Sequence, residues 1–191
     1  MNRNLTDYIV KIPFLEKYLC EQTVFELEQL DESVWEQHRF FNSKTHQSEP
    51  LSGNQELSTL STDSVKNKEL IMSKLWHGIE KYIKFLNFPW FNGWNGYTDI
   101  RFNRYSANTK MRLHCDHINS MFDGERKGVP ILSCLGLLNN AFKGGEFIMF
   151  DDLKIELKQG ELVIFPANFL YPHRVEPVTK GIRYSYISWV W

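Results

Sequence analysis

Apolar residues recur at helical intervals in two stretches of the first half of the chain. Between Glu21 and Leu30 they fall on one side of a short helix. Between Thr62 and Leu86 they return every three or four positions, at Val65, Leu70, Leu75, Ile79, Tyr82, Ile83 and Leu86. Thr62, Asp63 and Ser64 offer side-chain oxygens that suit a helix N-cap. The pattern therefore predicts two helices, Glu21–Leu30 and Thr62–Leu86.

Polar residues dominate the segment between these helices, Asn42–Ser64, which is rich in Ser, Thr, Asn and Gln. Such a composition predicts a surface loop with few apolar anchors. Long loops inside compact domains are often functional, so a lid or a substrate-facing loop is the alternative interpretation.

The second half of the chain changes to short apolar runs that alternate with polar residues and are separated by Gly, Asn and Asp. Glycines in KGGEF and KQGEL suit hairpin turns. The runs that read as strands are YTDIRFNRYS, VPILSCLGLL, GEFIMF, KIELK, ELVIFP and YSYISWVW. Many short strands without helices between them predict a mainly β fold, an antiparallel barrel or jelly roll (a double-stranded, cupin-like β-helix). The N-terminal helices would buttress one of its sheets.

Length and composition fit one globular domain. The chain has 191 residues, of which 42% are hydrophobic and 15% aromatic. We expect a single domain, with helical support and a loop over residues 1–94 and a jelly-roll core carrying the site over residues 95–191.

The net charge and the cysteines indicate which partners and which cellular compartment to expect. The formal net charge of −1 gives no electrostatic footprint for nucleic acid or an anionic membrane. No apolar run approaches the roughly 20 residues that span a bilayer, and the N-terminus lacks a signal-type apolar core. Three cysteines without C-x-x-C spacing indicate reduced thiols, so we expect a cytoplasmic protein.

Candidate metal ligands cluster in MRLHCDH, residues 111–117. In a strand, side chains two positions apart share a face, so His114 and Asp116 can point inward together while Cys115 and His117 point away. Among the six histidines only His173 lies downstream of this stretch of residues 111–117. Two histidines and one carboxylate form a facial triad, the ligand set of non-haem Fe(II) oxygenases.

Simpler interpretations remain for these residues. A lone H-x-D occurs often by chance, and His173 alone would suit a partly buried core position. The three together would also suit zinc, in a structural or a hydrolytic role. A structural zinc site usually has four protein ligands, often thiolates, and Cys115 is expected to face the other way.

Arg183 adds a group that binds carboxylates bidentately. A dicarboxylic keto acid would use both parts of such a site, because its keto oxygen and C1 carboxylate suit the metal while its far carboxylate suits Arg183. The alternative for Arg183 is a surface position on the alternating strand GIRYSYISW.

The order H-x-D, H, R on a strand-rich half resembles the Fe(II)/2-oxoglutarate-dependent dioxygenases, and within them the prolyl 4-hydroxylase-like branch. The likeness covers roughly Asp99–Trp191. It rests on three segments, RYSANTKMRLHCDH, LLNNAFKGGEF and FPANFLYPHRVEPVTKGIRYS. Phage-borne members of this branch are similar in length and layout, and a viral source would place the protein in the host cytoplasm.

The resemblance implies roles for individual residues. It implies that Fe(II) is bound by His114, Asp116 and His173. It further implies that Arg183 pairs with the C5 carboxylate of 2-oxoglutarate and that Tyr105 hydrogen-bonds near this co-substrate. O₂ would be the second co-substrate and ascorbate a candidate accessory reductant.

One position departs from the family pattern. Oxygen-sensing members carry a Tyr before LN that contacts the C5 carboxylate, and this chain has Leu137 there. We expect Ser133 or Ser185 to supply that contact instead. The same resemblance implies that Trp189 and Val175 line the substrate pocket.

The branch implies a prolyl residue of a peptide or protein as substrate, hydroxylated at the expense of 2-oxoglutarate, which yields succinate and CO₂. A free amino acid or another small molecule is an alternative, as is a non-catalytic cupin-like binding module. A nucleic-acid demethylase is disfavoured, because Trp189 and Trp191 stand where such enzymes carry a second Arg. The aromatic run Phe88–Tyr97 suits core packing better than a proline groove.

Overall fold

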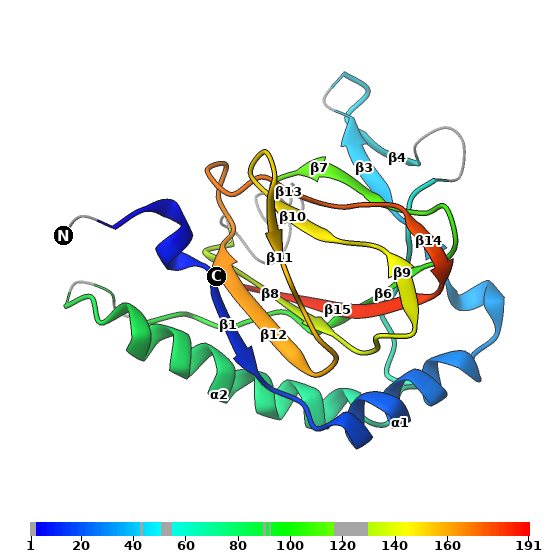
Figure 1. Cartoon of the computed structure of the whole chain (residues 1–191), viewed down its shortest axis with the longest axis horizontal. Helices are drawn as coiled ribbons and strands as arrows, with labels where there is room; N and C mark the ends of the chain where they lie inside the picture. The colour runs from blue at the N-terminus through cyan, green and yellow to red at the C-terminus, as the bar shows by residue number, and fades with distance from the viewer. Residues whose placement is uncertain (1–2, 43, 51–54, 90, 92, 117–129) are drawn as a thin grey trace.

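Figure 1 shows a computed structural model of the chain, which describes residues 3–42, 44–50, 55–89, 91, 93–116 and 130–191. Every pairing between its strands is antiparallel. The mainly β jelly roll predicted from the sequence is confirmed, and two helices pack against it on one side (Figure 1).

The larger sheet has seven strands and forms the floor of the jelly roll. Their order across the sheet is β1 (Val10–Pro13), β12 (Glu161–Pro166), β8 (Leu132–Leu137), β15 (Arg183–Val190), β6 (Arg101–Tyr105), β5 (Ser58–Leu60) and β2 (Glu36–Gln37). Segments from the first half of the chain thus extend both edges of a sheet whose centre comes from the second half.

A second sheet of four strands faces the inner side of this floor (Figure 1). Its order is β11 (Leu153–Ile155), β10 (Phe147–Met149), β13 (His173–Val175) and β7 (Met111–His114). Two further pairs complete the strands: β14 (Val178–Gly181) with β9 (Phe142–Gly144), and β3 (Arg39–Asn42) with β4 (Gln47–Pro50).

The helices α1 (Lys17–Glu28) and α2 (Lys68–Leu86) cover the outer side of the large sheet (Figure 1). Two short 3-10 helices, Leu5–Tyr8 and Glu32–Val34, lie in the same half of the chain. A β-carbon on Gly78 of α2 would lie 3.0 Å from the Leu162 side chain, so the helix and β12 approach closely. No helix in the described part of the chain has the length and apolar composition needed to cross a bilayer.

The two faces of the large sheet contribute side chains to two different hydrophobic clusters, because neighbouring side chains on a strand point to opposite faces. Phe102, Leu162 and Tyr186 point toward the helices and join the first cluster. Tyr105, Leu135, Phe165, Ile187 and Trp189 point inward and join the second, between the sheets. The candidate site lies on this inner side.

Both helices begin at other residues than predicted. Helix α1 starts at Lys17, before Glu21, and α2 starts at Lys68, after Thr62. The predicted caps are wrong because the Thr62 hydroxyl accepts a hydrogen bond from the Ser64 backbone N–H, at 3.1 Å, which forms a turn of its own. The helix instead begins after Asn67, whose side chain makes no capping bond.

The prediction of a loop over Asn42–Ser64 is wrong in part. Asn42 ends β3, β4 forms a hairpin with it, and β5 pairs with β6. In β4 the side chains are mostly exposed, so pairing of the backbone and not burial of apolar residues organises this segment. The hairpin projects beyond the two sheets on the side of β7 (Figure 1).

The glycines of KGGEF and KQGEL do not make hairpins between paired neighbours. Strand β9 pairs with β14 while β10 pairs with β11 and β13, so Gly144 and Gly145 lie where the chain passes from one pair of strands to another. Gly160 likewise precedes β12, with φ of +83°, and a β-carbon there would lie 2.2 Å from the Leu15 carbonyl oxygen. Glycine is therefore required at this crossing by backbone contact.

Candidate metal centre

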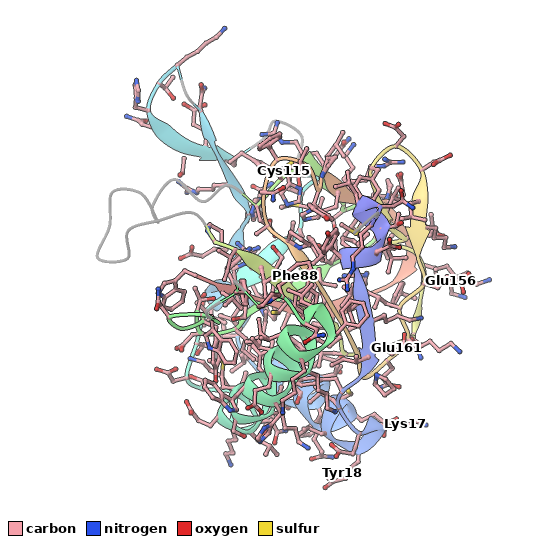
Figure 2. All side chains as sticks on the ribbon, turned by 90° about the vertical axis from the view of Figure 1, so that its left-hand side faces the viewer. Lys17, Tyr18, Phe88, Cys115, Glu156 and Glu161 are labelled. Carbon is pink, nitrogen blue, oxygen red and sulfur yellow. The ribbon has the colours of Figure 1, made fainter. Side chains whose placement is uncertain are left out.

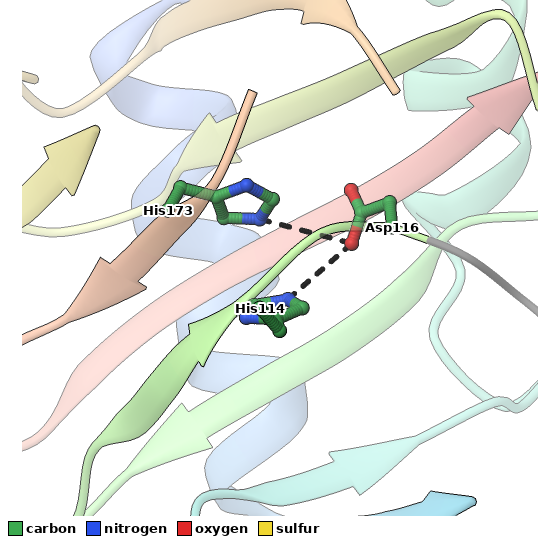
Figure 3. Close-up of side chains that lie close together, drawn as sticks. All are labelled: His114, Asp116 and His173. Carbon is green, nitrogen blue, oxygen red and sulfur yellow. Dashed lines mark ion pairs between the residues drawn. The ribbon is translucent and has the colours of Figure 1, made fainter. Parts of the chain in front are cut away.

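Adjacent strands bring His114 and His173 together. His114 is the last residue of β7 and His173 the first of β13, and the two are directly paired in the sheet. Their ring centroids lie 4.3 Å apart. Asp116 follows β7 by two residues and turns its carboxylate toward both rings (Figure 3).

The three ligand atoms converge. His114 Nε2 lies 3.3 Å and His173 Nε2 3.7 Å from Asp116 Oδ1, and all three candidate donors lie within 4.8 Å of one another. Cys115 points elsewhere, because its Sγ contacts the Phe169 carbonyl oxygen at 3.5 Å. His117, expected to face away, lies outside the described residues.

Backbone carbonyls fix the orientation of both rings. His114 Nδ1 donates to the Arg112 carbonyl oxygen at 2.8 Å, and His173 Nδ1 donates to the Tyr171 carbonyl oxygen at 3.0 Å. The proton of each neutral imidazole is therefore on Nδ1, and the lone pair of Nε2 faces Asp116. This outer hydrogen bond is the arrangement usual for histidines that bind metals.

The charge state of the cluster favours a cation. Burial lowers the pKa of His173 to about 4, so this imidazole is neutral near pH 7. Burial raises the pKa of Asp116, but the hydrogen bond that the Ser133 hydroxyl donates to Oδ2 lowers it and favours the carboxylate. Two lone pairs and a buried carboxylate thus face one another with no proton between them, and a divalent ion would satisfy all three.

Ser133 belongs to this centre and not to the co-substrate end where we expected it. Its Oγ donates to Asp116 Oδ2 at 2.5 Å, which leaves Oδ1 directed at the histidines. Ser133 pairs with Trp189 across β8 and β15, whereas Ser185 pairs with Leu137, four residues further along β8. The sequence held no signal for this contact, because it depends on the position of Asp116 beyond the end of β7.

Arg183 lies deep between the sheets, 1% exposed, with no carboxylate partner among the described residues. Its Nη1 donates to Ser185 Oγ at 2.9 Å, its Cζ lies 4.9 Å from the centre of the Tyr105 ring, and its Nε has no described partner. Burial lowers the pKa of Arg183, which marks the cost of an unpaired buried guanidinium.

A cavity of about 260 Å³ reaches this guanidinium. Its walls include Leu137, Phe142, Gly145 and Phe147. A small dicarboxylic acid fits the chemistry of this place, because one of its carboxylates can pair with the Arg183 guanidinium. Leu137 supplies only an apolar wall, and the polar side chains beside Arg183 are those of Ser185 and Tyr105.

The two predicted pocket residues lie on opposite walls of the inner space. Val175, on β13, is buried between its cross-strand neighbours Met111 and Phe147. Trp189, on β15, is 9% exposed, and the Arg101 guanidinium carbon lies 5.1 Å from the centre of its ring. Arg101 was not anticipated from the sequence.

Two further aromatic groups come from the β3–β4 hairpin side. The Phe40 ring lies 6.3 Å from the His114 ring, and the Arg112 guanidinium carbon lies 3.7 Å from the centre of Phe40. The His38 ring lies 4.6 Å from Phe40. Phe40 therefore lies beside His114, and the hairpin contributes to the surroundings of the site.

The aromatic run Phe88–Tyr97 does not frame the site in the part that the structure describes. Phe88, Trp94 and Tyr97 pack against the helix-side cluster, and Trp94 lies 4.7 Å from Trp76 of α2. Figure 2 shows Phe88 just beyond the end of α2, away from Cys115, the neighbour of Asp116. Core packing, the interpretation favoured from the sequence, accounts for Phe88, Trp94 and Tyr97.

Buried neutral histidines make the metal-free protein sensitive to acid. Burial lowers the pKa of His38 to about 3 and that of His173 to about 4. Between pH 6.5 and these values the unfolded chain binds protons that the folded chain does not, so stability falls as pH falls. From pH 7.5 to 5 we expect urea unfolding to show a loss of roughly 1–2 kcal/mol for each histidine. His38→Gln should reduce this loss. His77→Gln, which replaces an exposed histidine of α2, should leave the loss unchanged. Equal losses in the native protein and in both variants would contradict this explanation.

Comparisons with known proteins agree with this geometry. Residues 100–191 match the family model of the 2OG-Fe(II) oxygenase superfamily. A PKHD-type hydroxylase from Idiomarina loihiensis is 34% identical over 94 residues, which cover 48% of this chain and 41% of that protein. A PKHD-type hydroxylase from Xylella fastidiosa is 35% identical over 100 residues, covering 47% and 43%. The chain therefore spans about two fifths of the length of these relatives.

Solved structures share the fold over nearly the whole chain. A prolyl hydroxylase from Trichoplax adhaerens, solved with a peptide of the hypoxia inducible factor oxygen degradation domain, has a TM-score of 0.70 at 18% identity and covers 97% of this chain and 84% of its own. A prolyl-4-hydroxylase from Pseudomonas putida has a TM-score of 0.65 at 18% identity and covers 96% and 92%.

Residues 100–191, which carry all three candidate metal ligands and Arg183, therefore form a 2OG-Fe(II) oxygenase domain. This class of dioxygenase uses Fe(II), 2-oxoglutarate and O₂. The relatives in sequence are PKHD-type hydroxylases, and the prolyl hydroxylases among the solved structures share the fold.

Proposed function

We propose that this protein is an Fe(II)- and 2-oxoglutarate-dependent hydroxylase that acts on a prolyl residue of a peptide or protein and forms 4-hydroxyproline. The observation that carries the proposal is the joint placement of His114, Asp116 and His173 with the unpaired, buried Arg183 on the same inner side of the jelly roll. A metal centre alone would fit several activities. The Arg183 guanidinium favours a dicarboxylate as the co-substrate that binds beside the metal.

Each residue has a part in this activity. When bound, iron(II) and 2-oxoglutarate supply the O₂-dependent hydroxylation of a C–H bond, coupled to formation of succinate and CO₂. His114 Nε2, His173 Nε2 and Asp116 Oδ1 would hold the iron, and Ser133 would keep the Asp116 carboxylate in place through Oδ2. Arg183 and Ser185 would hold the C5 carboxylate, close to Tyr105.

The walls of the site would orient the substrate and exclude water. Val175 and Phe165 close the side of His173, whose ring centroid lies 5.1 Å from that of Phe165. Phe40 of the hairpin lies beside His114, and Trp189 offers a flat apolar surface that suits the ring of proline. The names of the structural neighbours, both prolyl hydroxylases, support a prolyl substrate for this chain.

Mass spectrometry of proline-containing peptides tests the substrate. With Fe(II), 2-oxoglutarate, ascorbate and O₂, a peptide substrate is expected to gain one oxygen atom at proline while an equal amount of succinate appears. The same peptides with alanine in place of proline serve as controls. Oxidation of free proline alone would assign a small-molecule hydroxylase, and ligand binding without succinate would assign a binding module; either result would overturn the proposal.

We also propose a cytoplasmic location. The described cysteines, Cys20, Cys115 and Cys134, form no disulfide, which supports a reducing compartment.

A further inference from the structure

A second arginine, Arg101, lies on the inner side of the large sheet. It is the first residue of β6 and pairs with Ile187, so its side chain shares a face with Tyr105 and the Arg183–Trp189 series. Its Nε donates to Asn103 Oδ1 at 3.2 Å, and its guanidinium carbon lies 5.1 Å from the centre of the Trp189 ring. The side chain is partly buried, and burial lowers its pKa.

Arg101 and Arg183 occupy opposite ends of the same surface. Arg183 pairs with Tyr105, four residues along β6 from Arg101, which corresponds to roughly 13 Å along the strand. Trp189, which Arg101 overlies, pairs with Ser133, and Ser133 holds Asp116. Arg101 is therefore near the metal-ligand end of this surface, because its partner Ile187 lies two residues from Trp189 and four from Arg183 on β15.

Arg101 has no carboxylate partner in the part of the chain that the structure describes. The contrast with Arg104 is direct, since Arg104 lies on the opposite face of the same strand and makes two bonds of 2.7 Å to Glu32. A partly buried guanidinium with one neutral hydrogen-bond partner has further N–H groups free to donate. A carboxylate suits it best, because its two oxygens can accept two parallel hydrogen bonds.

The surroundings of Arg101 add positive potential. Burial is the main cause of the lowered pKa of His38, and this imidazole is close enough for the charges of Arg101 and Arg112 to lower it further. The Asp116 carboxylate opposes this potential, both at His38 and at Arg101 itself, and the candidate metal would neutralise it. Arginines in such surroundings favour an anionic ligand.

The co-substrate does not account for this charge. In the proposed function one carboxylate of 2-oxoglutarate pairs with Arg183 and the other belongs at the metal, so neither is left for Arg101. We propose that Arg101 recognises a carboxylate of the hydroxylated substrate, within one residue of the target proline. This inference rests on the proposed function and specifies its substrate class. The carboxylate has two possible sources, the side chain of an acidic neighbour and the α-carboxylate of a C-terminal proline.

Three matched pairs of fluorescein-labelled peptides test the inference. The first pair carries Glu or Gln before the proline, the second carries Glu or Gln after it, and the third ends in proline as the acid or the amide. Binding is measured anaerobically with Fe(II) and 2-oxoglutarate, by fluorescence anisotropy, so that no turnover is needed. The native protein is expected to bind the acidic member of at least one pair about tenfold or more tightly. The pair that shows the preference identifies the source of the carboxylate.

The variants separate recognition from folding. Arg101→Met should abolish the preference and Arg101→Lys should retain part of it, whereas Arg104→Met, the same change on the opposite face of β6, should keep it in full. Equal binding of both members in all three pairs by the native protein would overturn the inference, and so would a preference that persists in Arg101→Met. A raised 2-oxoglutarate requirement in Arg101→Met, with the peptide preference intact, would assign Arg101 to the co-substrate instead.

Failure of the proposed function gives a different result. If the native protein released no succinate but still bound the acidic peptides more tightly, the proposed hydroxylase activity would be rejected and the proposed carboxylate site would be kept. Succinate release and proline oxidation without discrimination would leave the hydroxylase and remove the role of Arg101.

Discussion

Replacing His173 by alanine is expected to abolish iron-dependent release of succinate. The variant loses one of three ligand atoms that lie within 4.8 Å of one another, and it leaves Asp116 as a buried carboxylate with a single imidazole neighbour. Loss of an outer partner of a metal ligand typically costs 10- to 100-fold, so loss of a ligand itself should exceed about 100-fold. Iron affinity, measured anaerobically against a chromogenic chelator, should fall with the activity.

Two other histidines provide matched controls for this experiment. His77→Ala removes an exposed imidazole that pairs with Glu80 on α2, and it should leave both iron affinity and turnover unchanged. His117→Ala removes the second histidine of MRLHCDH and is expected to keep activity nearly intact. Unchanged turnover in His173→Ala would remove this residue from the site, and loss of iron in His117→Ala would reverse the choice between the two neighbouring histidines.

Replacing Arg183 by methionine is expected to raise the 2-oxoglutarate requirement by about 30-fold or more, with little change in iron affinity. Truncating one member of a buried charge pair usually costs 2 kcal/mol or more, which corresponds to that factor. The measurement is the concentration of 2-oxoglutarate at half-maximal succinate release, with Arg104→Met as the control.

The same substitution should not weaken the fold in the absence of co-substrate. Arg183 is 1% exposed and has no described carboxylate partner, so an apolar side chain of similar length removes a desolvated charge. Urea unfolding of Arg183→Met without 2-oxoglutarate should therefore give an equal or higher free energy of unfolding. An unchanged 2-oxoglutarate requirement would mean that the co-substrate does not pair with this guanidinium.

The strands of the second half could be predicted because their patterns are strong. ELVIFP coincides with β12, and its apolar residues alternate between the helix-side cluster and the inner cluster. Strands of three or four residues, such as β9 and β14, bury too little to leave a pattern in the sequence. The β3–β4 hairpin is polar on its exposed sides, so its pairing also leaves little trace.

The candidate metal ligands could be predicted from the sequence, but the residues that contact and orient them could not. Strand alternation places His114 and Asp116 on one side, although β7 ends at His114 and the backbone carries Asp116 beyond it. Ser133 reaches Asp116 only because β8 and β15 pair in a particular register, and Arg101 reaches Trp189 for the same reason. Register between distant strands is a tertiary property that a single sequence does not display.

Anomalous diffraction from crystals grown with Fe(II) and 2-oxoglutarate, kept free of oxygen, tests the account most directly. It should show one ion held by His114 Nε2, Asp116 Oδ1 and His173 Nε2, with the far carboxylate of 2-oxoglutarate on Arg183. An ion closed by a fourth protein ligand, or a 2-oxoglutarate molecule away from Arg183, would contradict the assignment as an oxygenase.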